Sequence, residues 1–130
     1  IYNPDYIVIV DETQIDNKVL KGIKDNTILI INTDEQRENI SSRLSLTERQ
    51  KERMVCIPAT KISRKNLGKV FPNIPMLTGI IHNLNIYSKE EYLEEIEKKL
   101  RESFSDREEL VKGNLNVAKE TWEYLEENYN

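Results

Sequence analysis

The sequence predicts an α/β protein with a mostly parallel sheet in its first half and helices in its second half. Residues 6–10 and 27–31 form two short runs rich in β-branched and other apolar residues. Such runs are apolar on both faces, which is typical of strands in a buried parallel sheet. A third, weaker run at 54–57 stops at Pro58. Because polar segments with helical features separate the runs, we expect parallel strands joined by right-handed crossovers.

The first half also contains the helices expected to join these strands. Residues 13–20 are predicted to form a short helix between the first two strands. Residues 35–53 are polar and are expected to be helical at both ends, with a capping box at 45–48 that starts the second of these helices. After the third strand, Thr60 is expected to cap a further helix over 61–67.

The second half is predicted to be helical throughout. Pro75 fits the first turn of a helix that ends near Leu84. Capping boxes at 88–91 and 105–108 start two more helices. Gly113 is expected to break or bend the last helix in its first turn. The apolar residues of that helix recur at alternating spacings of four and three, which places them on one stripe: Val111, Leu115, Ala118, Trp122, Leu125 and Tyr129.

Length and composition fit one domain, residues 1–130, of 15.3 kDa. Apolar runs such as 28–31 are far shorter than the roughly 20 residues of a membrane span, so a transmembrane protein is not expected. A signal peptide would show as a basic segment followed by an apolar stretch, and this pattern is not seen in the sequence. The sequence begins at Ile1, without Met, at the foot of a predicted strand, and we therefore expect it to be part of a longer chain.

The sequence contains one cysteine, Cys56, and one histidine, His82. The chain therefore has neither the ligands of an iron–sulfur cluster nor a zinc-binding set, and it cannot form an internal disulfide. This favours a reducing, cytoplasmic location. Cys56 is expected to be a small apolar core residue in the third strand, and His82 a surface or interface residue. Since no nucleophile and base can be paired, we predict no catalytic residue and no metal ligand.

Ligand sites of parallel sheets form beyond the carboxyl ends of the strands. Four residues at these ends are candidates for cofactor binding: Asp11, Asn32, Thr60 and Lys61. The alternative is that they only cap turns and helices, as such residues usually do. No glycine-rich loop follows a strand, so backbone amides are not expected to hold a phosphate group.

The net charge of −4 is unevenly distributed. Residues 88–130 carry 13 acidic and 7 basic residues, whereas residues 43–69 carry eight basic residues against Glu48 and Glu52. This basic stretch predicts a positive surface for an anionic cofactor or an acidic partner, unless it is simply a solvated face. Nucleic acid is not an expected partner, because the stretch has no aromatic residue for stacking on bases.

Several short strings, taken in order, resemble one enzyme family. They are Pro4-Asp-Tyr-Ile-Val-Ile-Val-Asp11, Ile31-Asn-Thr33, Pro58-Ala-Thr-Lys-Ile62, Leu67-Gly68, and Asn73-Ile-Pro-Met-Leu77 followed by Gly79. Their order and spacing, with the acidic helical tail, resemble the gamma subunit or domain of the 2-oxoacid:ferredoxin oxidoreductases, the pyruvate and ketoisovalerate group. The likeness extends well over residues 1–86 and loosely over the tail.

The resemblance implies a three-layer α/β/α domain within a larger enzyme. Enzymes of this group decarboxylate a 2-oxoacid such as pyruvate on thiamine diphosphate, pass electrons through iron–sulfur clusters to ferredoxin, and release an acyl-coenzyme A. The resemblance implies that thiamine diphosphate, magnesium, the clusters and coenzyme A are bound by partner subunits, and that this chain is not active alone. The glycine-rich loop of the gamma module is absent, so we expect the chain to be its C-terminal two-thirds. Thr78 also stands where the family has glycine after Met-Leu.

The resemblance further implies that parts of the surface contact partner subunits. Residues 73–79 are expected to form such a contact, with Asn73 and Pro75 in it and Met76 as its apolar anchor. The basic stretch is expected to face an acidic region of a partner or the phosphates of coenzyme A. Its proposed contact residues include Arg49, Arg53 and Lys65. The alternatives are a stand-alone α/β domain that binds a small ligand, or a nucleotide-dependent regulator, which the missing glycine loop disfavours.

Overall fold

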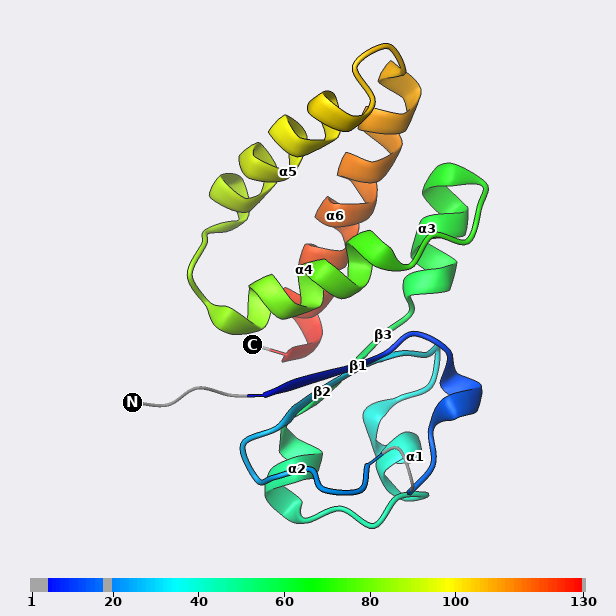
Figure 1. Cartoon of the computed structure of the whole chain (residues 1–130), viewed down its shortest axis with the longest axis vertical. Coiled ribbons are helices and arrows are strands. Elements are labelled where there is room, and N and C mark those ends of the chain that lie inside the picture. Colours follow the sequence, from blue (N-terminus) through cyan, green and yellow to red (C-terminus); the bar gives the residue numbers. More distant parts are fainter. Residues whose placement is uncertain (1–4, 18–19, 130) are drawn as a thin grey trace. The chain divides into compact units, whose positions relative to one another are not determined.

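The computed structural model describes residues 5–17 and 20–129. The chain forms two compact units, residues 1–58 and 59–130 (Figure 1). The α/β class, the parallel sheet and the helical C-terminal half are confirmed. Grouping of the two units into one domain with three layers stays a prediction. None of the helices in the described part of the chain is both long and apolar enough to span a membrane.

The first unit is built on a three-stranded parallel sheet in the order β1-β2-β3. The strands are β1 (Tyr6–Ile9), β2 (Ile28–Asn32) and β3 (Met54–Ile57). Ile7 lies opposite Leu29, and Leu29 lies opposite Met54. All three predicted strands are thus confirmed, with shifts of one residue at the ends of the first two.

The helices of the first unit are short. They are the 3-10 turn η1 (Glu12–Gln14), α1 (Arg37–Ser41) and α2 (Glu48–Glu52). The helix predicted over 13–20 is wrong for the described residues, because only the 3-10 turn forms and Ile15 is already extended. Residues 18–19 lie outside the described residues. This segment has too few apolar side chains at helical spacing to bury one face, which is what stabilises a short helix.

The capping box before α2 lies two residues later than predicted. Thr47 Oγ1 accepts a hydrogen bond from the Gln50 amide at 3.2 Å, and the Gln50 side chain accepts one from the Thr47 amide at 2.9 Å. The Ser45 amide instead donates to the Asn17 side chain at 2.9 Å. Gln50 is buried, so its amide group needs this partner.

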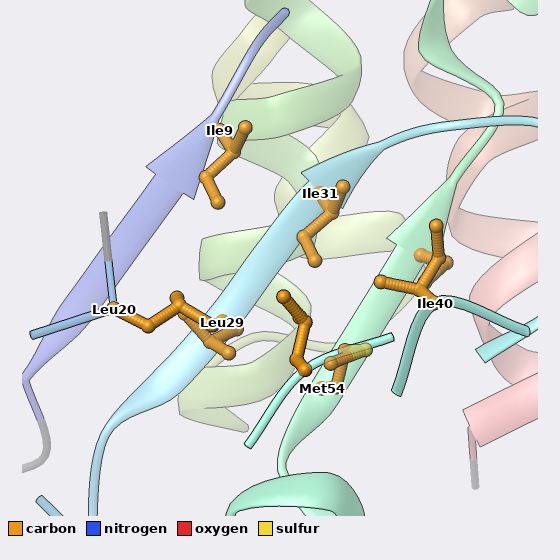
Figure 2. Packing of buried hydrophobic residues seen from close by; sticks show 8 residues of the cluster. Ile9, Leu20, Leu29, Ile31, Ile40 and Met54 are labelled. Atoms are coloured by element: carbon orange, nitrogen blue, oxygen red, sulfur yellow. The ribbon is translucent and has the colours of Figure 1, made fainter. Parts of the chain in front are cut away.

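The core of the first unit lies on one face of the sheet (Figure 2). Ile9 of β1, Leu29 and Ile31 of β2 and Met54 of β3 point to this face, where they pack with Leu20, Ile40, Leu44 and Cys56. Cys56 is 1% exposed and fills space in the core as predicted. Elsewhere in the three strands, Ile28, Ile30 and Val55 are buried and Ile7 is half-buried.

The second unit consists of four helices: α3 (Ala59–Leu67), α4 (Asn73–Leu84), α5 (Lys89–Ser103) and α6 (Glu108–Tyr129). The first three all pack against α6 (Figure 1). Side chains of α4, α5 and α6 form a second core around Tyr92, Ile96, Leu100, Val111, Ala118 and Trp122. The predicted stripe on α6 is confirmed, with Leu115 and Tyr129 half-buried at its margin.

One of the predicted helix starts in this unit is confirmed and two are corrected. Ser88 and Glu91 form the predicted capping box of α5, and these hydrogen bonds lower the pKa of the Glu91 carboxyl. However, α3 begins at Ala59, so Thr60 lies inside its first turn and is not its cap. The start of α6 is also later than predicted, because the carbonyl of Arg107 accepts the first helical hydrogen bond, from Val111.

Gly113 does not break α6, which is helical from Glu108 to Tyr129. Instead, Gly113 lies where α6 approaches α3 closely. A Cβ atom at this position would lie 2.5 Å from Cδ2 of Leu67 and 3.3 Å from the carbonyl oxygen of Asn66. The glycine therefore allows α3 and α6 to pack more closely than another residue would permit.

The sheet core yields a test of the first unit. We expect Ile31→Ala to lower the free energy of unfolding by about 2–5 kcal/mol, because it leaves a cavity among fully buried side chains. Val10→Ala, at a position 46% exposed, is the matched control and is expected to change it by less than about 0.5 kcal/mol. Chemical denaturation followed by circular dichroism measures both. A loss below about 1 kcal/mol for Ile31→Ala would place this residue outside the core.

Candidate functional site

Asp11 and Asn32 lie at the carboxyl ends of β1 and β2, at the same edge of the sheet. The Asp11 carboxylate accepts hydrogen bonds from the Thr13 amide at 3.0 Å and the Thr13 hydroxyl at 2.8 Å. These bonds hold the pKa of the Asp11 carboxyl below its usual range. The Asn32 amide donates to the carbonyl oxygen of Val10 at 3.0 Å. Both residues therefore have local structural roles, Asp11 as the cap of η1 and Asn32 as a tie between the ends of two strands.

Thr33, which follows Asn32 at the strand end and is not among the four candidates, completes this polar edge. Its buried hydroxyl donates to the Glu12 carboxylate at 2.5 Å and accepts from the Glu35 amide at 3.1 Å. Among the described residues, no buried side-chain nitrogen or oxygen lacks a hydrogen-bond partner. These contacts favour the capping alternative, and a ligand role for Asp11 and Asn32 stays a prediction.

Thr60 and Lys61 lie in the first turn of α3, in the second unit. Thr60 is half-buried and its carbonyl oxygen accepts a hydrogen bond from the Ser63 hydroxyl at 3.1 Å, while Lys61 is exposed. Because Asp11 and Asn32 belong to the first unit, a cleft shared by all four candidates stays a prediction.

The basic stretch 43–69 is divided between the two units. Within the described part of the chain, Arg43 forms an ion pair with Glu35, Lys51 with Glu48 and Lys65 with Glu120. Arg49 is exposed on α2, and Arg53 is half-buried and donates to the carbonyl oxygen of Arg49 at 3.3 Å. Part of the positive charge is thus balanced within the chain, and a single positive surface stays a prediction.

Residues 73–79 form the first half of α4. Asn73 and Leu77 are exposed, whereas Pro75 is fully buried and Met76 is 4% exposed. The expectation that Met76 is a surface anchor is therefore corrected, since a helix that buries Met76 turns the next residue outward. The same correction applies to Pro75, whose side chain is fully buried. A partner contact by this segment stays a prediction for Asn73, and Leu77 is the exposed apolar residue beside it.

Thr78 is fully buried and connects α4 to α5. Its hydroxyl oxygen lies 2.7 Å from the carbonyl oxygen of Ile74 and 2.6 Å from the hydroxyl of Tyr92. Because the Thr78 proton is donated to the carbonyl, Tyr92 is the donor to Thr78. Burial raises the pKa of Tyr92 to about 12, so the tyrosine keeps its proton and this bond at physiological pH.

His82 is half-buried against Trp122, with ring centroids 4.9 Å apart in an edge-to-face arrangement. Burial lowers the pKa of the imidazole, and the nearby Glu126 carboxylate partly opposes this effect. The described residues contain no group of three or more histidine, cysteine, aspartate or glutamate side chains arranged to hold a metal ion. The geometry of His82 is that of a packing residue.

Comparisons with known proteins place these elements in a family. The sequence profile of the family described as pyruvate ferredoxin/flavodoxin oxidoreductase matches residues 1–124. The chain belongs to this family. The resemblance seen in the ordered sequence strings is thereby confirmed.

Curated relatives of the chain are named as subunits of such enzymes. The chain is 28% identical over 127 residues to the pyruvate/ketoisovalerate oxidoreductases common subunit gamma of Pyrococcus furiosus, covering 97% of the chain and 64% of the relative. It is 26% identical over 124 residues to the pyruvate synthase subunit PorC of Thermotoga maritima, covering 93% of the chain and 60% of the relative. The chain thus spans less than two thirds of the length of these relatives.

A solved structure has the same fold. The crystal structure of pyruvate oxidoreductase subunit PORC from Thermotoga maritima superposes with a TM-score of 0.70, at 23% sequence identity. The match covers 95% of this chain and 64% of that chain.

The bond between Thr78 and Tyr92 yields a test of how α4 is held. Tyr92→Phe keeps the ring and removes the donor, so we expect the free energy of unfolding to fall by about 0.5–1.5 kcal/mol. Tyr87→Phe, at an exposed position, is the control and is expected to have no measurable effect. Both are measured by urea denaturation. If the two variants were equally stable, the buried hydroxyl pair would not contribute to stability.

Proposed function

We propose that the chain is a non-catalytic gamma-type subunit or domain of a 2-oxoacid:ferredoxin oxidoreductase. The enzyme catalyses oxidative decarboxylation of a 2-oxoacid such as pyruvate to an acyl-coenzyme A and transfers the electrons to ferredoxin. The observation that carries the proposal is the family match over residues 1–124, together with relatives named subunit gamma or PorC. A stand-alone ligand-binding or regulatory domain is the alternative, and membership of this family favours the subunit.

The small number of cysteine ligands in the chain supports a subunit that binds no iron–sulfur cluster itself. A cubane iron–sulfur cluster needs about four cysteine ligands, whereas the chain has a single cysteine in the core of the first unit. The proposal therefore assigns the clusters to partner subunits. By resemblance to the family it assigns thiamine diphosphate, magnesium and coenzyme A to them as well, with ferredoxin as an indirect partner. The proposed location of the complex is the cytoplasm.

Co-expression with the partner subunits tests the proposal. The tagged chain is expected to co-purify in fixed stoichiometry with chains that carry thiamine diphosphate and clusters, because its contribution is structural. By itself, the purified chain is expected to show neither an iron–sulfur absorption band in the visible range nor 2-oxoacid oxidation. Clusters or turnover in the chain alone would contradict the proposal, and an active complex that forms without the chain would support the alternative.

The basic residues offer a second test, of the partner contact. We expect simultaneous reversal of Arg49, Arg53, Lys61 and Lys65 to Glu to weaken association with the partner subunits at low salt. Single exposed pairs contribute only about 0–1 kcal/mol, so the effect comes from their sum. At about 1 M salt the Debye length is about 3 Å, and the wild type and the variant should then bind alike.

The control carries the same change in charge outside the basic stretch. It reverses four exposed lysines to Glu: Lys21, Lys24, Lys112 and Lys119. A threefold variant that keeps Lys65 separates the lost ion pair with Glu120 from the lost surface charge. Circular dichroism verifies that each variant is folded. Equal affinity of the wild type and the fourfold variant at low salt would identify the stretch as a solvated face.

A further inference from the structure

The second unit contains a cavity of about 640 Å³, whose lining includes Asn73 and Leu77 of the segment predicted to contact a partner. Figure 1 shows α4 and α5 diverging from the connection at 85–88, while both pack against α6. The cavity is bordered by the ends of α3 and α5, the loop after α3, and the first turns of α4 and α6. All of its lining residues belong to residues 59–130.

The walls of the cavity are mainly apolar. Eight apolar side chains line it: Leu67, Phe71, Ile74, Leu77, Ile96, Leu100, Phe104 and Leu110. Phe71 is 51% exposed and Leu77 is 40% exposed, so both lie at the open side, whereas Leu100 is buried. The volume lies within the range of about 300–1,000 Å³ that is typical of small-molecule sites. Binding of an apolar ligand group in this space is favoured, because it removes apolar surface from water.

The charges at the cavity are all of one sign. Lys69 and Lys99 line it and no carboxylate does, although α5 and α6 are rich in glutamate. Neither lysine forms an ion pair with any described residue. Lys98 and Arg101, which flank this part of α5, are by contrast paired with glutamates. Two lysines that form no ion pair with a described residue therefore line an apolar space.

From this arrangement we propose that the cavity binds an amphipathic anion, namely an aliphatic carboxylate of medium chain length. The aliphatic chain occupies the apolar space between α4 and α5, and the carboxylate lies at Lys69 and Lys99. The Ser103 hydroxyl, also in the lining, adds a neutral hydrogen-bond donor. A cationic headgroup would meet two like charges at the same place, so the site discriminates by charge as well as by apolar surface.

The proposal does not depend on the proposed oxidoreductase role, because the cavity is formed by this chain alone. It is tested with the whole 130-residue chain by isothermal titration calorimetry against octanoate, octanol and octylamine. The three probes share one aliphatic chain and differ in headgroup charge. Octanoate is expected to bind at least about tenfold more tightly than octylamine, a difference of about 1.4 kcal/mol. Similar affinities for octanoate and octylamine, or no octanoate binding, would overturn the proposal.

Variants locate the binding site on the protein. Joint substitution Lys69→Glu and Lys99→Glu is expected to weaken octanoate binding by about tenfold or more and to remove the preference over octylamine. The matched control, Lys112→Glu with Lys119→Glu, changes the net charge equally on exposed positions of α6 outside the lining and should bind octanoate as the wild type does. Equal octanoate affinity in the two double variants would refute the assignment to Lys69 and Lys99.

A steric variant covers the case in which charge reversal disturbs folding. Ser103→Trp places a large side chain at an exposed position of the lining and is expected to abolish binding of octanoate and octanol alike. Lys112→Trp, at an exposed position outside the lining, is its control and should leave both affinities unchanged. Thermal unfolding verifies that both variants are folded. Undiminished octanoate binding to a folded Ser103→Trp variant would show that the ligand binds elsewhere and would overturn the proposal.

Discussion

Packing against α6 is the constraint on which the second unit depends. Gly113 lets α3 approach closely, and farther along α6 the Trp122 ring stacks on Tyr92 of α5, with ring centroids 5.2 Å apart, and meets His82 of α4 at its edge. The hydroxyl of Tyr92 in turn holds Thr78, so one aromatic group fixes both α4 and α5. Because α4 and α5 are both held by α6 and diverge from one another, apolar space remains between them. The proposed ligand site is thus a consequence of the same packing.

How much of the fold the sequence predicts depends on how many local signals compete. The strands are predictable because a run such as Ile28–Ile31 is apolar on both faces, which only a buried strand or helix permits. Ser88 and Glu91 form an unambiguous capping box, whereas residues 45–50 contain two overlapping ones, from Ser45 to Glu48 and from Thr47 to Gln50. The structure uses the second box, in which the buried Gln50 takes part. Gly113 shows the same limit, since the sequence reveals its freedom but not the neighbouring helix that requires it.

The candidate site was harder to predict than the fold, for reasons of geometry. The sequence identifies Asp11 and Asn32 as strand-end residues. It does not show that Asp11 binds Thr13 and that Asn32 binds the Val10 carbonyl, which are structural contacts. Adjacent residues in a helix point in different directions, so the string around Met76 does not reveal that Leu77 is the exposed one. The cavity left no sequence signal, because its lining comes from segments far apart in the chain and its two lysines are thirty positions apart.

The chemistry of the described residues limits what this chain can contribute to the proposed enzyme. Cys56 is enclosed in the sheet core, and His82 packs on Trp122 with a lowered pKa. The pKa of Tyr92 is raised to about 12, so its hydroxyl stays protonated at physiological pH. These three side chains are thus committed to packing or to a buried hydrogen bond. The proposed gamma-type role is accordingly assigned to the surfaces of the chain rather than to these three side chains. Charged residues that form no ion pair with a described residue, such as Arg49, Lys69 and Lys99, are the candidates for these contacts with partners and ligands.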